Sequence, residues 1–144
     1  MVRKAEKKDI SVIADLAVLL WSDNSAEDLR NEFAEMLSND GAQIFLKYEN
    51  DVPVGFAQCQ LRNDYVEGTE TSPVGYLEGI FIKEDYRGRG YAKELLAACE
   101  KWAESKGCKE FASDCEISNN VSFLFHMAVG FTEANRIVCF TKKL

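Results

Sequence analysis

Arginine and glycine alternate in one short segment, Arg87-Gly88-Arg89-Gly90-Tyr91-Ala92, and these residue types could bind a phosphate group. The apolar run Leu77 to Ile82 precedes the segment and predicts a buried strand, and from Tyr91 to about Lys106 apolar residues recur at helical spacing. Glycine lets the backbone approach a ligand closely, and the free N–H groups at a helix N-terminus favour an anion. The sequence therefore predicts an anion site where this strand passes into this helix.

The spacing of the glycines excludes two common phosphate motifs. A dinucleotide fingerprint would need a third glycine at Lys93, and the Walker pattern GxxxxGK[ST] is absent. The pattern that fits is R-x-x-G-x-A, which resembles the acetyl-CoA pyrophosphate loop of the GNAT superfamily of N-acetyltransferases. The alternative is an ordinary tight turn between a strand and a helix, with two solvated arginines.

The length and composition predict one globular domain spanning residues 1–144. Apolar residues make up 47% of the chain and only two prolines occur, so the chain is expected to fold around a core. No apolar run approaches the ~20 residues that cross a bilayer, and Met1 to Glu6 lacks the apolar block of a signal peptide. We therefore expect a cytoplasmic protein that is not bound to a membrane.

The charge and the cysteines narrow the possible partners. A net charge of −7 argues against nucleic acid, which calls for a basic face, and permits a cationic partner. The five cysteines are scattered without a CxxC pair, so neither a disulfide framework nor a metal site is expected.

The periodicity of the whole chain predicts an α+β fold with mixed strand directions. Strands are expected near residues 2–5, 43–48, 54–61, 77–82, 109–113 and 137–141. Helices are expected after the caps Asp9 and Ser25, from Tyr91 to about Lys106, and after Asn119. The polar segment Arg62 to Pro73 has no clear period and is long for a hairpin loop, which suggests a functional loop.

The resemblance to GNAT enzymes extends beyond the glycine loop. Asn119 followed by the segment His126 to Phe131 is similar to a later motif of the superfamily, in which an asparagine precedes a helix that ends in Gly-Phe. Five further segments resemble the aminoglycoside 6′-N-acetyltransferases: Asp64–Gly68, Ser72–Val74, Leu77–Phe81, Gly107–Cys108 and Ala112–Asp114. From Trp21 onward the likeness covers most of the chain. It implies the GNAT fold, a twisted, mostly antiparallel sheet flanked by helices with splayed central strands, and a homodimer.

An aminoglycoside carries several amines, so its site needs several carboxylates around a cleft. The candidates near strand ends or in the long loop are Asp23, Asp64, Glu67, Glu70, Glu78, Asp114 and Glu116. Glu78 differs from the rest because it lies within an apolar strand, where a carboxylate has either a partner or a function. The resemblance implies substrate contacts at Trp21, Tyr65, Glu78 and Asp114, and at Asn135, where close relatives have an acidic residue.

The resemblance also implies which residues bind acetyl-CoA. The pantetheine arm would pair with the backbone of Ile80, Phe81 and Ile82 like an added strand, with a bulge at Gly79 splaying the sheet. The pyrophosphate would be bound by the loop residues Arg87, Gly88, Arg89, Gly90, Tyr91, Ala92 and Lys93. Asn119 would bind the pantetheine arm, cap its helix, or do both.

The implied reaction is direct transfer of acetyl from the thioester to a primary amine. Glu78 is the first candidate for accepting the proton of the amine and Asp114 the second. His126 stands where many superfamily members have the tyrosine that protonates the leaving thiolate, and a histidine could take that role, but a packed helix histidine is the favoured interpretation, which leaves the general acid open between His126, water and none. Two other readings stay open: an acetyltransferase for a polyamine, peptide N-terminus or other small amine, and a non-catalytic acetyl-CoA-binding module.

Overall fold

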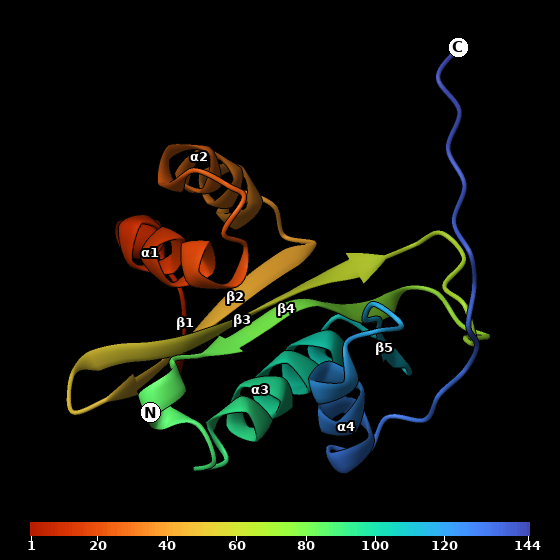
Figure 1. The fold of residues 1–144 in the computed structure, drawn as a ribbon. Coiled ribbons are helices and arrows are strands. Elements are labelled where there is room, and N and C mark those ends of the chain that lie inside the picture. Colours follow the sequence, from red (N-terminus) through yellow and green to blue (C-terminus); the bar gives the residue numbers. More distant parts are fainter.

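The computed structural model describes all 144 residues, and its elements form one sheet with helices on both faces (Figure 1). The strands are β1 (Val2–Lys4), β2 (Ala42–Glu49), β3 (Val52–Arg62), β4 (Val74–Ile82) and β5 (Phe111–Ser113). The helices are α1 (Ile10–Leu20), α2 (Ala26–Leu37), α3 (Tyr91–Ser105) and α4 (Asn120–Ala128), with 3₁₀ turns η1 (Lys7–Asp9) and η2 (Glu84–Tyr86). Strands follow the order β1-β2-β3-β4-β5, and only β4 and β5 are parallel. The predicted α+β fold with a mixed, mostly antiparallel sheet is confirmed.

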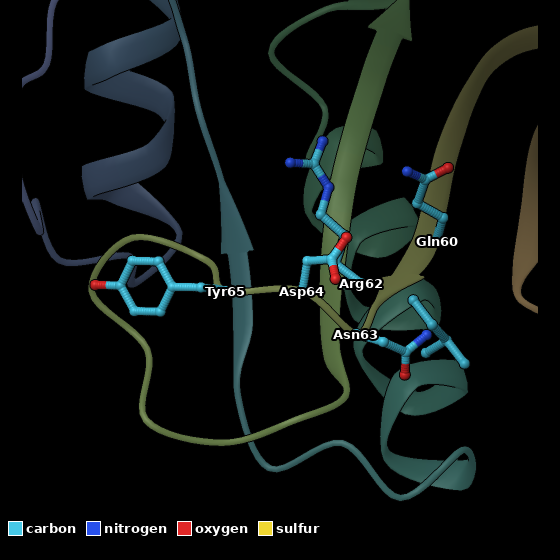
Figure 2. Close-up of a pocket in the computed structure, with 6 residues that line it drawn as sticks. Gln60, Arg62, Asn63, Asp64 and Tyr65 are labelled. Atoms are coloured by element: carbon cyan, nitrogen blue, oxygen red, sulfur yellow. The ribbon is translucent and has the colours of Figure 1, made fainter.

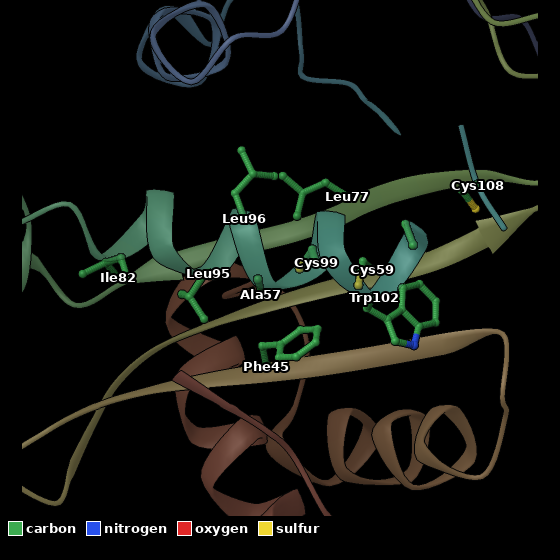
Figure 3. Packing of buried hydrophobic residues seen from close by; sticks show 11 residues of the cluster. Phe45, Ala57, Cys59, Leu77, Ile82, Leu95, Leu96, Cys99, Trp102 and Cys108 are labelled. Carbon is green, nitrogen blue, oxygen red and sulfur yellow. The ribbon is translucent and has the colours of Figure 1, made fainter. Parts of the chain in front are cut away.

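Each face of the sheet has its own apolar core, because strand side chains alternate between the two faces. Helices α1 and α2 bury Ile13 and Phe33 against Phe56 of β3 on one face. Helix α3 buries Leu95 and Trp102 on the other face, together with the cluster drawn in Figure 3. None of the helices combines the length and apolarity that a membrane crossing requires.

The helix starts are only partly as the sequence predicts. Ser25 caps α2 as expected, since its Oγ accepts a hydrogen bond from the Asp28 N–H at 3.1 Å. Asp9 precedes α1 but makes no cap hydrogen bond to that helix. Its carboxylate accepts two bonds from Arg3 at 2.8 Å and one from the Glu6 N–H at 2.8 Å, so it ties β1 to the η1 turn instead.

The central strands splay, as the resemblance implies. Strand β4 pairs with β5 only from Gly75 to Leu77, and its remaining half, residues 78–82, has no strand along the edge that faces away from β3. On the β3 side the register shifts: Gln58 is paired with Gly79 and Cys59 with Leu77, so Glu78 is not paired with any residue of β3. The bulged residue is therefore Glu78 and not Gly79, and a bulge re-aims the side chain that it carries.

The strand predicted over residues 137–141 is wrong. Residues 132–144, here called the C-terminal arm, contain no strand or helix and run away from the body of the molecule (Figure 1). The alternation of apolar residues that suggested a strand is present, but Ile137, Val138 and Phe140 are 66%, 77% and 88% exposed. A β-pattern becomes a strand only where another strand is available to pair with it.

Candidate active site

The loop that connects β4 to α3 presents a row of free backbone donors. None of the N–H groups from Gly88 to Lys93 has an acceptor within the protein, and the first helical hydrogen bond comes from the N–H of Glu94 to the Gly90 carbonyl. Gly88 and Gly90 have φ values of +76° and +80°, which residues with a Cβ rarely adopt. Six consecutive donors at a helix N-terminus form a nest for an anion, and residues 88–93 are called the anion loop below.

The two arginines of the motif connect the anion loop to neighbouring strands. Arg87 donates its Nε to the Ile82 carbonyl at 2.9 Å. Arg89 forms an ion pair with Glu49 at 2.9 Å, and Glu49 also accepts a bond from the Tyr91 hydroxyl, an interaction that lowers the pKa of the Glu49 carboxyl. The hairpin between β2 and β3 thus holds the anion loop in place, while both guanidinium groups remain exposed.

Ile80, Phe81 and Ile82 lie on the splayed half of β4. One backbone edge of this segment pairs with β3, at Ala57, Phe56 and Gly55, and the other edge faces the gap left by β5. An extended ligand that carries amides could add to that edge as a further strand. Because η2 and the anion loop follow Ile82 directly, one molecule could span both features.

Glu78 and Asp114 belong to one hydrogen-bonded cluster, called the polar floor below, which consists of Arg62, Tyr76, Glu78 and Asp114. Arg62 donates Nε and Nη2 to the same oxygen of Glu78, Oε1, at 3.1 and 2.8 Å. The Arg62 guanidinium lies 3.4 Å from the centre of the Tyr76 ring. The Tyr76 hydroxyl in turn donates to Asp114 Oδ2 at 2.5 Å, and burial together with this bond raises the pKa of Tyr76.

Trp21 borders the same face of the sheet. Gly79 leaves room for it, because a Cβ on Gly79 would lie 2.6 Å from Trp21 Cζ2. The indole also meets the Phe56 ring edge-on, with the ring centres 5.9 Å apart. Trp21 is only partly buried, so one part of the ring packs on β3 and β4 and the rest stays accessible.

A cavity of about 440 Å³ opens where β3 runs into the loop of residues 63–73. Figure 2 shows the residues that line it, among them Gln60, Arg62 and Asp64. Tyr65 also borders the cavity, but its ring points away from Gln60 and Arg62 and is 77% exposed. In this conformation, therefore, Tyr65 does not join the polar floor.

The loop of residues 63–73 is anchored at several points. Val66 is buried beside Tyr76, and the backbone N–H groups of Glu70 and Thr71 both donate to Glu110 Oε1 at 2.9 and 2.8 Å. At the base of the C-terminal arm, Asn135 donates Nδ2 to Glu67 Oε1 at 2.8 Å. Asn135 thus lies against this loop, but it makes no contact with the polar floor.

The two remaining predicted residues lie on α4 and just before it. Asn119 caps the helix, because its Oδ1 accepts from the Ser122 N–H at 3.1 Å. His126 Nδ1 lies 2.7 Å from the Ser122 carbonyl oxygen, which can only accept, so Nδ1 carries the hydrogen. In the neutral ring Nε2 then accepts from the Ser113 hydroxyl at 2.7 Å. Both ring nitrogens are occupied by protein groups.

Known proteins share the sequence pattern and the fold of this chain. The sequence model of the acetyltransferase (GNAT) family matches residues 12–131, which is most of the chain and includes the anion loop and α4. The chain belongs to the GNAT family of acetyltransferases. GNAT enzymes use acetyl-CoA as the acetyl donor, and the free N–H groups and the open edge of β4 fit its pyrophosphate and its amide-bearing arm.

Curated relatives of this GNAT protein span nearly its whole length. An aminoglycoside N(6′)-acetyltransferase type 1 of Salmonella enteritidis is 36% identical over 142 residues, covering 99% of this chain and 98% of the relative. An enzyme of the same name from Serratia marcescens is 42% identical over 130 residues, covering 90% of this chain and 89% of the relative.

Solved structures show the same GNAT fold. AAC(6′)-Iy in complex with the bisubstrate analogue CoA-S-monomethyl-acetylneamine superposes with a TM-score of 0.96 at 35% identity, covering 100% of this chain and 98% of that one. AAC(6′)-IG from Acinetobacter haemolyticus gives a TM-score of 0.95 at 34% identity, with 100% and 99% coverage.

Two residues of this GNAT site escape sequence reasoning. Arg62 and Tyr76 join Glu78 to Asp114, but Arg62 looks like an ordinary charge at the start of a polar loop, and Tyr76 like a strand aromatic. A weak signal was present: Glu78 is a carboxylate in an apolar strand and requires a partner. The partner comes from the end of β3, so naming it needs the register between two strands.

Proposed function

We propose that residues 1–144 form a single domain that acts as an aminoglycoside 6′-N-acetyltransferase, moving acetyl from acetyl-CoA to the 6′-amine of the antibiotic and so conferring resistance. The observation that carries the proposal is the polar floor beside the open edge of β4. Two carboxylates, Glu78 and Asp114, flank an aromatic ring there, next to the segment that fits the acetyl donor. Carboxylates together with an aromatic face suit a polyhydroxylated polycation.

The acetyl donor is assigned to the anion loop and β4. The free N–H groups of residues 88–93 bind the pyrophosphate, with Arg87 and Arg89 adding positive charge. The backbone of Ile80, Phe81 and Ile82 pairs with the pantetheine arm. Asn119, which caps α4, is assigned to the same arm.

Acetyl-CoA supplies an acetyl thioester, and the amine must lose a proton to be acylated. Both bonds from Arg62 go to Oε1 of Glu78, so Oε2 remains to accept this proton, directly or through water. Asp114 is the second candidate, although the Tyr76 hydroxyl already occupies its Oδ2. Trp21, Tyr65 and Asn135 are assigned to contacts with the sugar rings.

The proton for the leaving thiolate is assigned to His126 acting through Ser113. His126 Nε2 and Ser113 Oγ are hydrogen-bonded, and Ser113 pairs with Leu77 where β4 and β5 begin to diverge. A serine hydroxyl can pass a proton on only if a neighbour replaces it. His126 can do so in its doubly protonated form, in which Nε2 donates to Ser113 Oγ, and the transfer leaves the ring neutral.

A substrate panel tests the function. The purified chain is mixed with acetyl-CoA and, in turn, an aminoglycoside with a 6′-amine, a matched aminoglycoside with a 6′-hydroxyl, spermidine and a peptide, and thiol release is followed. Release with the 6′-amine compound alone is the expected result. Release with spermidine or the peptide instead would favour another small-amine acetyltransferase. Tight CoA binding without release for any amine would favour a non-catalytic module.

A homodimer is part of this proposal. The C-terminal arm leaves the body with its apolar side chains exposed, and α4 exposes Val121, Leu124 and Met127 nearby in the chain. Apolar surface of this kind is usually covered, and we assign it to a second copy of the chain. The five cysteines are free thiols, which suits the reducing cytoplasm, where we place the enzyme.

Light scattering tests the dimer. The intact protein should elute with twice the chain mass of 16.2 kDa, and a truncation that ends at Arg136 should elute as a monomer. The truncation is expected to fold, because the residues it removes are exposed and form no strand or helix. A monomeric intact protein at micromolar concentration would contradict the proposal.

A further inference from the structure

Arg62 places a cation in the part of the site where the substrate is expected to place one. Its guanidinium is bonded to Glu78 and lies on the Tyr76 ring. Arg62 is also one of the residues that line the cavity at the end of β3 (Figure 2). An ammonium group on an aminoglycoside would seek the same surroundings, a carboxylate oxygen and the face of an aromatic ring. Arg62 and the substrate therefore compete for the same partners.

The ion pair between Arg62 and Glu78 lies where water can reach it, so it can be broken at a modest cost. The side chain of Arg62 is 38% exposed and that of Glu78 is 20% exposed, so water reaches the pair and breaking it leaves no buried charge stranded. Arg62 is the last residue of β3, and its side chain reaches the polar floor from the mouth of the cavity. Asp64 borders the same cavity and offers another carboxylate to a displaced guanidinium.

We propose that Arg62 is a resident counter-ion of Glu78, which the 6′-ammonium group of the substrate displaces on binding. Displacement has two consequences. Affinity for the acceptor is lower than the carboxylates alone would give, because every binding event must first break the Arg62 contacts. Discrimination is sharper, because only a group that can replace both the ion pair and the cation–π contact recovers their energy. The inference rests on the proposed function and specifies how the charge of Glu78 is balanced before the acceptor binds.

The test is the affinity of an aminoglycoside for Arg62→Met, measured by titration calorimetry without acetyl-CoA. Methionine keeps much of the apolar stem and removes the charge. If the guanidinium must be displaced, its removal should tighten binding by about fivefold, the scale of a partly exposed ion pair with a cation–π contact. Lys101→Met is the matched control, because it removes one positive charge from an exposed position on α3, across the sheet, and should change the affinity little.

Two further measurements separate displacement from a general change in electrostatics. A matched aminoglycoside with a 6′-hydroxyl should gain less from Arg62→Met, since it lacks the ammonium that takes the vacated place. In a Glu78→Gln background, Arg62→Met should give no gain, because the contested carboxylate is gone. An equal gain for both ligands, or a gain that persists without Glu78, would overturn the inference.

The opposite role for Arg62 also has a clear signature. If Arg62 only orients Glu78, Arg62→Met should lower kcat while the calorimetric affinity stays the same or weakens, and Arg62→Lys should rescue part of the rate. That result would overturn displacement and leave the acetyltransferase function intact. If the unmodified protein binds and acetylates no aminoglycoside, the proposed function itself has failed. A thermal melt of each variant serves as the control that its fold is kept.

Discussion

In the proposed function the anion loop and the polar floor bind two substrates of opposite charge, and the polar groups of these two regions differ in how far the protein itself satisfies them. The anion loop leaves six backbone N–H groups without a partner, from Gly88 to Lys93. In the polar floor the side chains are bonded to one another, from Arg62 through Glu78 on one side to Tyr76 and Asp114 on the other. The anion loop therefore presents free hydrogen-bond donors, whereas in the polar floor Arg62 already occupies the position that we propose for an ammonium group of the substrate.

The difference follows from what each half is made of. Backbone donors at a helix end are fixed by the helix and exposed to water, so leaving them free costs little. In the polar floor the carboxylate of Glu78 is partly buried, which costs free energy, and the neighbouring cation Arg62 relieves that cost. We infer that the anion loop sets the affinity for acetyl-CoA through the fixed geometry of its N–H groups. The polar floor sets the selectivity among acceptor amines, because Arg62 and the amine compete for Glu78 and Tyr76. Four substitutions test this comparison, in decreasing order of expected effect.

Gly90→Val should abolish measurable binding of CoA, raising the dissociation constant by about a hundredfold or more. A β-branched residue at a φ of +80° is strained, and relief of that strain would move the anion loop. Calorimetric titration with CoA measures the effect. Gly107→Ala is the control, because Gly107 has a φ of +89° but lies past the far end of α3. If Gly107→Ala weakens CoA equally, the loss reflects general instability.

Glu78→Gln should lower kcat/KM for an aminoglycoside by about a hundredfold, the scale of a lost general base. CoA affinity should be unchanged, because the anion loop uses backbone groups that Glu78 does not touch. Glu104→Gln on the exposed face of α3 serves as the control for lost charge. A variant that keeps most of its rate would move the proton-accepting role to Asp114 or to water.

Asp9→Asn tests an arginine–carboxylate pair that belongs to neither half. The bidentate bonds from Arg3 lower the pKa of Asp9 to about 2, against an ordinary value near 3.8. A lowered folded-state pKa contributes stability that is full above pH 4 and is lost as the pH falls through about 2. Urea unfolding should show a loss of about 2 kcal/mol at pH 7. The gap to the unmodified protein should close between pH 4 and pH 2.

Asp15→Asn, on the exposed face of α1, is the matched control for Asp9→Asn and should leave stability unchanged at both pH values. Neither variant should change the KM for an aminoglycoside. A change in KM for Asp9→Asn alone would mean that this ion pair affects the site, and it could then no longer serve as an ion pair outside the site for comparison with Arg62 and Glu78.

Tyr76→Phe should have the smallest effect, a loss of about 1 kcal/mol in the free energy of unfolding. The substitution keeps the ring beneath Arg62 and removes only the hydroxyl that donates to Asp114. Because Asp114 is exposed, water can replace the lost bond, and the rate should change by less than about threefold. Tyr65→Phe, which removes an exposed hydroxyl, is the control for stability. A large loss of rate would show that the phenol takes part in catalysis.

The sequence predicted the acetyl-donor half of the site because its signals are local. Positions 88 and 90 have positive φ values that residues other than glycine avoid, and the apolar spacing after Tyr91 indicates where the helix begins. The same applies to Ser25 and Asn119, whose cap bonds reach only three residues along the chain. Such features depend on short-range sterics and need no knowledge of the fold.

The sequence named Glu78 and Asp114, but only the tertiary structure decided how the polar floor is connected and how the C-terminal arm runs. The bulge at Glu78 and its pairing with Arg62 depend on the register between β3 and β4, and Arg62 and Glu78 lie 16 positions apart in the chain. Residues 137–141 carry a strand pattern but find no neighbouring strand in their own chain. A pattern of side chains states what a segment can pair with, whereas the partner itself is chosen by the packing of distant segments.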